Sequence, residues 1–291
     1  MRLTRRQMLA RTTALAGISS VIPLQGMLRP EKKFYIGTCD WSIGKGGDPA
    51  AFDVAKKIGL DGVQVSLGSA SNNMHLRNLA LQQTYREASR RTGVKIASLA
   101  IGELNNIPYK SDPRAEEWVW DSIEVAKNLG VTVILLAFFN NNDLRNDAKG
   151  KAEVISRLKK VAPRAESMGV VLGIESYLNA AEHLEIIEKV GSPSIKVYYD
   201  FRNTQDAGFD TLQEMKKLGT QHICELHMKE NGTLLQDGTL PWEKIRDQIY
   251  DMGYYGDGWM QIEWAHADGA DIPESYRQNL RFLRNLFKKK L

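Results

Sequence analysis

The sequence of 291 residues has little of what marks several specialised classes of protein. It contains two cysteines and no low-complexity tract, and no stretch approaches the ~18 consecutive apolar residues that a membrane helix requires. The phosphate-binding fingerprint G-x-G-x-x-G is absent after the first predicted strand, and we interpret Gly44, Gly46 and Gly47 as part of a flexible loop. These absences argue against a membrane-spanning protein and against a doubly wound nucleotide-binding sheet.

Positive charge is concentrated at the amino terminus. Residues 1–33 hold seven basic residues and one acidic residue, a balance of +6, whereas the formal net charge of the whole chain is +4. The remainder, from Phe34 onward, therefore has a balance of −2 by the same count. A basic nucleic-acid-binding surface is not indicated, and we expect no nucleic-acid partner.

The same segment contains the pattern Thr-Arg-Arg-Gln-Met-Leu at residues 4–9, and a modest apolar run follows from Ala14 to Leu24. This arrangement resembles a twin-arginine (Tat) export signal. We interpret residues 1–33 as a leader and residues 34–291 as one folded domain. The interpretation implies transient contact with the Tat export machinery and an exported, periplasmic location. An amphipathic amino-terminal helix is the alternative, and no clear Ala-x-Ala cleavage site follows the run.

From Phe34 onward, short apolar runs alternate with longer amphipathic stretches, as expected for parallel βα units. The predicted strands cover 34–38, 62–66, 95–100, 131–137, 170–174, 195–200, 222–227 and 259–263. The predicted helices cover 49–58, 77–92, 113–129, 147–168, 180–190, 209–218, 241–252 and 274–289. Most of these helices are followed by a glycine just before the next strand, which is typical of a helix C-cap. Eight such units predict an α/β fold, a (β/α)8 TIM barrel in a single domain.

The two cysteines, Cys39 and Cys224, fall near the first and the seventh predicted strands. Those strands are not neighbours in an eight-stranded barrel, so the two Cα atoms would lie too far apart for a disulfide. We therefore predict two free thiols.

Ionisable side chains end four consecutive predicted strands: Glu175, Asp200, His227 and Glu263. Functional groups of TIM barrels lie at the carboxyl ends of the strands, and successive parallel strands are neighbours. The four side chains should converge at the barrel mouth, where three carboxylates repel one another unless a cation is bound. We predict a site for one divalent metal ion, with Mn²⁺ or Mg²⁺ preferred by these hard ligands and Co²⁺ or Zn²⁺ as alternatives.

The motifs around these residues resemble those of the sugar phosphate isomerase/epimerase superfamily, which has a xylose isomerase-like TIM barrel. They are Gly-Ile-Glu at 173–175, Tyr-Asp-Phe-Arg-Asn at 199–203, Leu-His-Met-Lys-Glu at 226–230 and Gln-Ile-Glu at 261–263. The resemblance covers the second half of the barrel. It implies that Glu175 and Glu263 are catalytic acid and base as well as metal ligands. The implied reaction is metal-dependent isomerisation or epimerisation of a sugar through an enediolate.

Two positions depart from the family pattern and leave the substrate open. Asn203 stands where the epimerases often have histidine, and Glu230 stands where they have aspartate. Asn203 can hydrogen-bond a substrate hydroxyl but cannot shuttle a proton near neutral pH. The other candidate substrate contacts each have a structural alternative, as a loop residue or as packing at the barrel rim. They are Lys229, His266, Trp41, Trp264, Glu103 and the asparagines Asn140, Asn141 and Asn142.

Several functions are compatible with such a site. The leading hypothesis is an isomerase or epimerase acting on a small, unphosphorylated sugar, because an exported protein meets few sugar phosphates and no phosphate cradle is evident. The same proton abstraction beside a leaving group would make the protein a dehydratase or lyase on a keto-sugar or keto-glycoside. An endonuclease IV-like nuclease would need more metal-binding histidines and a basic face. A non-catalytic sugar-binding barrel is a further alternative, and a homo-oligomer is left open.

Overall fold

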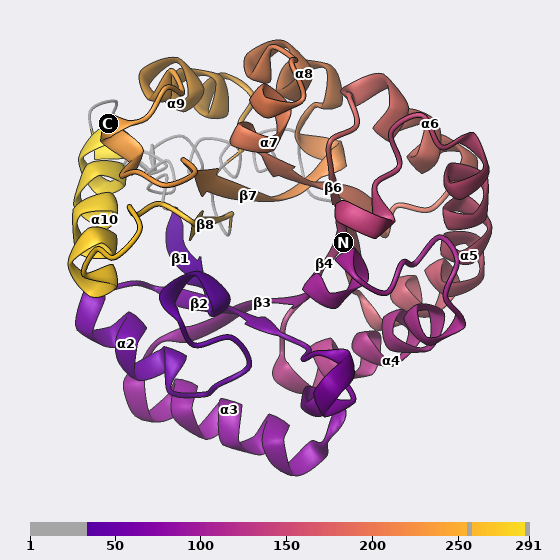
Figure 1. The fold of residues 1–291 in the computed structure, drawn as a ribbon, viewed down its shortest axis with the longest axis horizontal. Coiled ribbons are helices and arrows are strands. Elements are labelled where there is room, and N and C mark those ends of the chain that lie inside the picture. Colours follow the sequence, from indigo (N-terminus) through magenta and orange to yellow (C-terminus); the bar gives the residue numbers. More distant parts are fainter. Residues whose placement is uncertain (1–33, 255–257, 289–291) are drawn as a thin grey trace, which may run out of the picture. The chain divides into compact units, whose positions relative to one another are not determined.

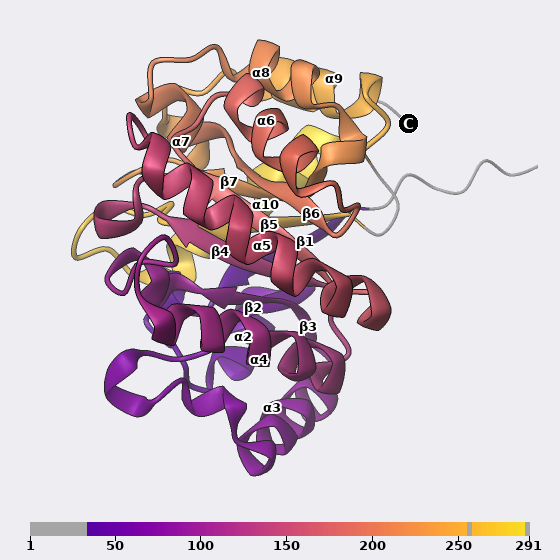
Figure 2. The same ribbon diagram turned by 90° about the vertical axis from the view of Figure 1, so that its right-hand side faces the viewer.

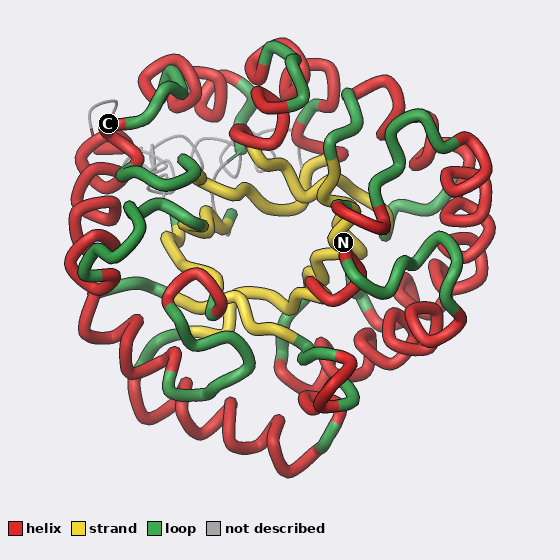
Figure 3. The backbone as a smooth tube through the Cα atoms, in the orientation of Figure 1, coloured by secondary structure: helices red, strands yellow, loops and turns green. Residues whose placement is uncertain are grey.

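The computed structural model describes residues 34–254 and 258–288, so the predicted leader lies outside the described residues and stays a prediction. Eight parallel strands form a closed barrel in sequential order, with helices around it (Figures 1 and 3). The strands are β1 (Tyr35–Cys39), β2 (Gly62–Ser66), β3 (Lys95–Ile101), β4 (Val133–Phe138), β5 (Val171–Ser176), β6 (Ile195–Asp200), β7 (Ile223–Lys229) and β8 (Trp259–Glu263). Strand β1 closes the barrel by pairing with β8, for example Thr38 with Ile262. The predicted single-domain (β/α)8 fold is confirmed.

Most of the helices lie within two residues of their predicted bounds. They are α2 (Ala51–Ile58), α3 (Leu79–Thr92), α4 (Pro113–Leu129), α5 (Ala148–Met168), α6 (Ala180–Val190), α7 (Phe201–Asp206), α8 (Thr211–Leu218), α9 (Trp242–Asp251) and α10 (Ile272–Lys288). The glycine ends behave as expected: Gly130 has φ 75°, and its N–H donates to two carbonyls of the last turn of α4. No helix in the described part of the chain is long and apolar enough to cross a membrane.

Helix α7 was not predicted, since the sequence analysis assigned no strand or helix to residues 201–208. Its cap is Asp200, whose side chain accepts a hydrogen bond from the Asn203 N–H at 2.8 Å. A strand-ending aspartate is a strong N-cap, but a helix of six residues is too short to show an amphipathic period. As a result, Asn203 in the first turn of α7 reaches the end of β5, where its amide nitrogen donates to Glu175.

Strand residues alternate between two cores. Leu99 and Ile101 belong to the large apolar cluster between the strands and the surrounding helices, which lie across the outer face of the sheet (Figure 2). Ala100 belongs instead to a small separate cluster with Leu135, Ala137 and Tyr198. Other buried positions on the strands are polar, and such groups require hydrogen-bond partners to remain there. Cys39 and Cys224 are free thiols, as predicted.

Gly173 on β5 lies in a closely packed part of the barrel wall. A Cβ atom added to Gly173 on β5 would lie 2.6 Å from the sulfur of Cys224 and 3.2 Å from Cβ of Tyr198. No such atom can be accommodated without a shift of its neighbours, because protein interiors are close-packed.

We expect Gly173→Ala to lower the free energy of unfolding by about 1–3 kcal/mol through overpacking. Removing the obstructing sulfur in Gly173→Ala/Cys224→Ala should recover part of this loss. Chemical denaturation measures both effects. Gly102→Ala is the matched control, since its added Cβ has no heavy atom within 4 Å. An equal loss in the control would contradict the packing explanation.

Candidate active site

The four predicted ligands meet at the carboxyl ends of β5 to β8. One ligand atom from each of Glu175, Asp200, His227 and Glu263 lies within 4.8 Å of all the others, and all four residues are buried. The Nδ1 atom of His227 lies 2.9 Å from Oε1 of Glu175, 3.7 Å from Oδ2 of Asp200 and 3.6 Å from Oε2 of Glu263. The convergence follows from the order of the strands, since β5, β6, β7 and β8 pair successively.

The electrostatics of this cluster are dominated by burial of like charges. Burial raises the pKa of Asp200 to about 7, although the ammonium of Lys229 opposes the shift. Burial alone would lower the pKa of His227, but the carboxylates of Glu175 and Glu263 outweigh it and raise that pKa to about 9. Burial also acts to raise the pKa of Glu263, but Lys229 and His227 outweigh it and lower the pKa. The upward shifts at Asp200 and His227 both favour the protonated forms, which reduce the repulsion within the cluster.

Two predicted substrate-binding residues are built into this cluster. The Lys229 Nζ atom lies 3.0 Å from Oε2 of Glu263 and 3.6 Å from Oδ2 of Asp200. It also donates a hydrogen bond to Oδ1 of Asn203 at 3.3 Å. The amide nitrogen of Asn203 donates in turn to Oε1 of Glu175 at 3.0 Å. Asn203 therefore orients a ligand carboxylate, a contact that places it at the site in spite of its departure from the family pattern.

The donor set fits a divalent cation. Oδ2 of Asp200 and Oε2 of Glu263 are buried and have no well-aligned hydrogen-bond donor, and the ammonium of Lys229 lies 3.6 Å and 3.0 Å from them as an ion-pair partner. A bound cation would place a second positive charge beside both oxygens and reduce the repulsion among the three carboxylates. Three carboxylates and one imidazole are hard donors of the kind that Mn²⁺ and Mg²⁺ bind.

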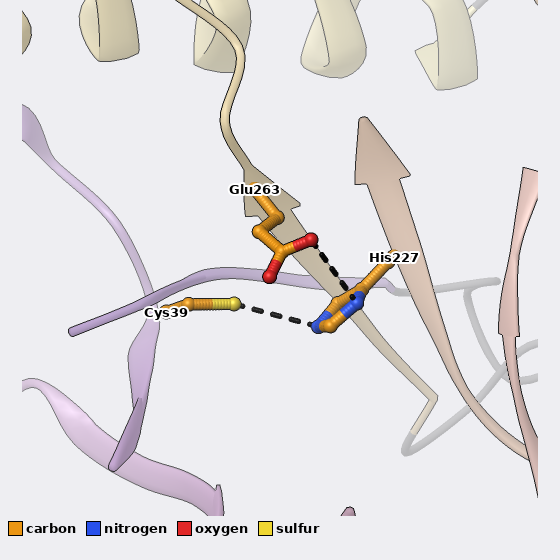
Figure 4. Close-up of side chains that lie close together, drawn as sticks. All are labelled: Cys39, His227 and Glu263. Atoms are coloured by element: carbon orange, nitrogen blue, oxygen red, sulfur yellow. Dashed lines mark hydrogen bonds and ion pairs between the residues drawn. The ribbon is translucent and has the colours of Figure 1, made fainter. Parts of the chain in front are cut away.

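Cys39, His227 and Glu263 form a second grouping with metal-ligand spacing, which shares two residues with the first (Figure 4). The sulfur of Cys39 lies 3.4 Å from Nε2 of His227, the ring nitrogen turned away from the carboxylates. Burial raises the pKa of the Cys39 thiol well above its ordinary value, so the sulfur keeps its proton and is a poor ligand. The first grouping is therefore the better cation site.

A cavity of about 440 Å³ opens beside the cluster. It is lined by Trp41, Ser66, Gly68, Gly102, Asn105, Leu135, Ala137, Phe139, Asn140, Glu175, Lys229, Glu263 and Trp264. Trp41 donates its indole N–H to Oε1 of Glu263 at 2.8 Å, so it also holds a ligand carboxylate. Trp264 is 42% exposed and has φ 47°, a strained backbone conformation for a bulky residue. The aromatic rings beside the carboxylates suit the apolar face of a small polar ligand.

Two other predicted residues lie away from the cavity lining. Glu103 is half-buried on a short 3-10 helix, Gly102–Asn105, and His266 contacts the carbonyl of Ala267 and the ring of Tyr276. Neither belongs to the lining residues, and their role at the site stays a prediction. Asn140 lines the cavity, whereas Asn141 and Asn142 donate to backbone carbonyls.

The remaining histidines have local partners. His75 contacts the carbonyl of Gly47, His183 contacts the hydroxyl of Ser176, and His222 contacts the carbonyl of Leu218. These contacts lie outside the ligand cluster.

The second departure from the family motif has a structural explanation. Glu230 is fully buried, and its carboxylate accepts hydrogen bonds from the Leu240 N–H at 2.8 Å and from Arg202 at 3.2 Å. The carboxylate packs against Gly238, and a Cβ atom added to Gly238 would overlap with it. Glu230 thus anchors the segment between β7 and α9 and does not line the cavity.

Several lining residues were missed by the sequence analysis. Ser66 ends β2 and Asn105 follows β3, so the strand-end criterion could have identified both. Phe139 and Gly68 also line the cavity, but no residue type or spacing marks them as functional.

The fold and the site define a class of protein: a closed (β/α)8 barrel with a candidate divalent-cation site at the carboxyl ends of its strands. The chain belongs to the xylose isomerase-like TIM barrel family, whose profile matches residues 52–286. It is 26% identical over 196 residues to 2-epi-5-epi-valiolone 7-phosphate 2-epimerase from Actinoplanes sp., covering 67% of this chain and 72% of that protein.

Solved structures share the fold at low identity. D-psicose 3-epimerase with D-tagatose, from Clostridium cellulolyticum H10, aligns with a TM-score of 0.73 at 17% identity, over 87% of this chain and 99% of that one. The apo form of 3-keto-D-glucoside 4-epimerase from E. coli aligns with a TM-score of 0.69 at 16% identity, over 87% of this chain and 100% of that one.

The buried ammonium of Lys229 supplies a testable contribution to stability. In metal-free protein at pH 8, we expect Lys229→Met to lower the free energy of unfolding by about 3–5 kcal/mol, since the variant leaves buried carboxylates without their counter-charge. Lys229 also faces Asp200, whose pKa is raised to about 7, so this carboxyl group is charged at pH 8 and protonated at pH 5, where the variant leaves one uncompensated charge fewer. The loss should shrink at pH 5.

Denaturation in the presence of a chelator, at both pH values, measures this effect. The charge-conserving variant Lys229→Arg serves as the control and should retain most of the stability. A loss that is the same at pH 5 and pH 8 would show that Lys229 acts by packing alone.

Proposed function

We propose that this protein is a divalent-metal-dependent sugar epimerase or isomerase that transfers a proton between Glu175 and Glu263. The observation that carries the proposal is that both glutamates belong to the buried ligand cluster and also line the cavity. The similar proteins described above are named as epimerases of sugars or of a sugar-like phosphate, which supports the same class of reaction.

The chemistry assigns a task to each residue. The metal ion, when bound, would polarise a substrate carbonyl and the adjacent hydroxyl, which acidifies the proton on the carbon between them. One glutamate removes that proton to give an enediolate, and the other returns a proton to it. Asn203 fixes Glu175 and Trp41 fixes Glu263, each by a hydrogen bond to the Oε1 atom. Lys229 supplies positive charge where negative charge develops on the substrate.

The cavity favours a substrate without a phosphate group. Among the described residues that line it, Lys229 has the one cationic side chain, and this side chain is already paired with Glu263 and Asp200. A phosphate is usually bound by free cations or by converging backbone N–H groups. We therefore infer a free or glycosidic keto-sugar as the substrate, unlike the 7-phosphate in the name of the Actinoplanes relative.

Glu175→Gln and Glu263→Gln should each reduce turnover by at least a factor of about 10², because each variant lacks a proton-transfer group. Solvent deuterium exchange across free, glycosidic and phosphorylated keto-sugars measures the step directly and identifies the carbon involved. Glu188→Gln is the control, since Glu188 is exposed on α6 and outside the cavity lining, and it should keep wild-type exchange.

Full exchange in both glutamine variants would refute the proton-transfer assignment. Faster exchange with phosphorylated sugars would refute the substrate class. Product analysis separates epimerisation from elimination, since a lyase would release an unsaturated product or an aglycone.

Metal binding should depend on pH with a defined sign. The pKa values of Asp200 and His227 are raised to about 7 and about 9, so protons compete with a cation for these two side chains, and they compete more strongly at pH 6 than at pH 8.5. We expect the thermal stabilisation by Mn²⁺ to be larger at pH 8.5 than at pH 6. At a Mn²⁺ concentration of 100 times Kd, the expected gain is about 2.7 kcal/mol.

Differential scanning calorimetry at the two pH values, with and without Mn²⁺, measures this stabilisation as a shift in Tm. Asp200→Asn should lose most of the shift, because it removes one ligand charge. A shift that is independent of pH, or that survives in Asp200→Asn, would place the metal elsewhere.

A further inference from the structure

A polar network lies one layer below the metal ligands, inside the barrel. Tyr198, Glu225 and Gln261 each precede a ligand of the cluster by two residues on the same strand, so they face the interior one step nearer the amino-terminal ends. Gln64 and Ser98 join them from β2 and β3 through hydrogen bonds. All of these side chains are buried, and none lines the cavity.

The network reaches the ligand cluster at the ring of His227. Oε1 of Gln64 lies 3.2 Å from Nε2 of His227, on the opposite edge of the ring from the carboxylates. The sulfur of Cys39 lies 3.3 Å from Oε1 of Gln64. The same sulfur lies 3.4 Å from Nε2 of His227 (Figure 4). The ring of Tyr198 packs against the imidazole with 4.5 Å between centroids.

The donors and acceptors of the network can be assigned by starting from Glu225. Oε2 of Glu225 accepts from the hydroxyls of Ser98, at 2.9 Å, and Tyr198, at 2.8 Å. The amide nitrogen of Gln261 also donates to this oxygen, at 3.4 Å, so Oε2 faces three donors and acts as an acceptor only. Each hydroxyl gives its single proton to Oε2, so both act as acceptors toward their other neighbour. That neighbour is the amide nitrogen of Gln64, which donates to them at 3.0 Å and 3.1 Å.

This direction also fixes the amide of Gln64. A reversed amide would turn its oxygen toward two hydroxyls with no proton left to give, and its NH₂ group toward the ring. The amide oxygen therefore faces His227, where it accepts from the Nε2–H and from the thiol of Cys39.

We propose that Gln64 is a positioning residue for the metal site, which keeps a proton on Nε2 of His227 and leaves Nδ1 as the atom that coordinates the cation. The inference rests on the proposed function, because it concerns the ligand His227. The competing arrangement has the proton on Nδ1, donated to Oε1 of Glu175 at 2.9 Å, and it blocks the ligand atom. Gln64 disfavours that arrangement, since its oxygen would then face a ring nitrogen without a proton.

The test replaces Gln64 with a side chain of similar length that has no acceptor. Gln64→Met should weaken Mn²⁺ binding about 10- to 100-fold in calorimetry, the range found for partners of metal-bound histidines. In the Mg²⁺-loaded protein, the Nε2–H proton of His227 should resonate downfield and exchange slowly in the wild type. Both signatures should be lost in Gln64→Met.

Gln261→Met is the matched control. Gln261 is equally buried in the same layer and donates to Glu225 at 3.4 Å, but it has no hydrogen bond to His227. Its replacement should lower stability while leaving Mn²⁺ affinity within about twofold, since the partner of the metal-bound imidazole is retained.

The outcomes separate the inference from the proposed function. Unchanged Mn²⁺ affinity in Gln64→Met, an Nε2–H signal of His227 that persists in Gln64→Met, or equal weakening in Gln261→Met would each overturn the positioning role alone. A wild-type protein that binds no Mn²⁺ would overturn the metal site and, with it, this inference.

Discussion

Close burial of three carboxylates is the constraint on which the rest of this structure depends. Glu175, Asp200 and Glu263 are brought together by the order of the strands, in a place where water cannot screen their repulsion. The buried ammonium of Lys229 and the raised pKa of His227 place positive charge beside the carboxylates. Hydrogen bonds from Asn203 and Trp41 occupy one oxygen of each glutamate. One oxygen each of Asp200 and Glu263 has the Lys229 ammonium as an ion-pair partner but no well-aligned hydrogen-bond donor, an arrangement that a divalent cation would complete.

The surroundings of the cluster divide into two parts with different chemistry. Above it, the cavity combines the carboxylates with aromatic walls, and its single cationic side chain is already paired. Below it, the barrel interior is filled by hydrogen-bonded polar groups in place of the branched apolar residues that usually fill such barrels. Such a network can remain buried because each shared proton has a defined donor and acceptor. The ring of His227 joins the two parts, with one nitrogen facing each.

The repeating βα pattern was sufficient to predict the barrel, because period, glycine caps and strand spacing are local properties of the chain. Helix α7 was missed because six residues are too few to display a period. The role of Glu230 was also inaccessible, since its partners Arg202 and Leu240 are reached only through the tertiary fold. The sequence analysis treated the departure at Glu230 as a sign of a different substrate, but the contacts of Glu230 are with other residues of the protein.

The sequence by itself determined the ligand cluster. Parallel strands in sequential order have their carboxyl ends at one rim, so Glu175, Asp200, His227 and Glu263 had to meet there. Only the tertiary structure decided which other side chains surround them: Gln64 contacts His227 from below, whereas Glu103 lies outside the cavity lining. The reason is physical: strand adjacency follows from chain order, but the course of a loop and contacts across a barrel depend on packing between residues far apart in sequence.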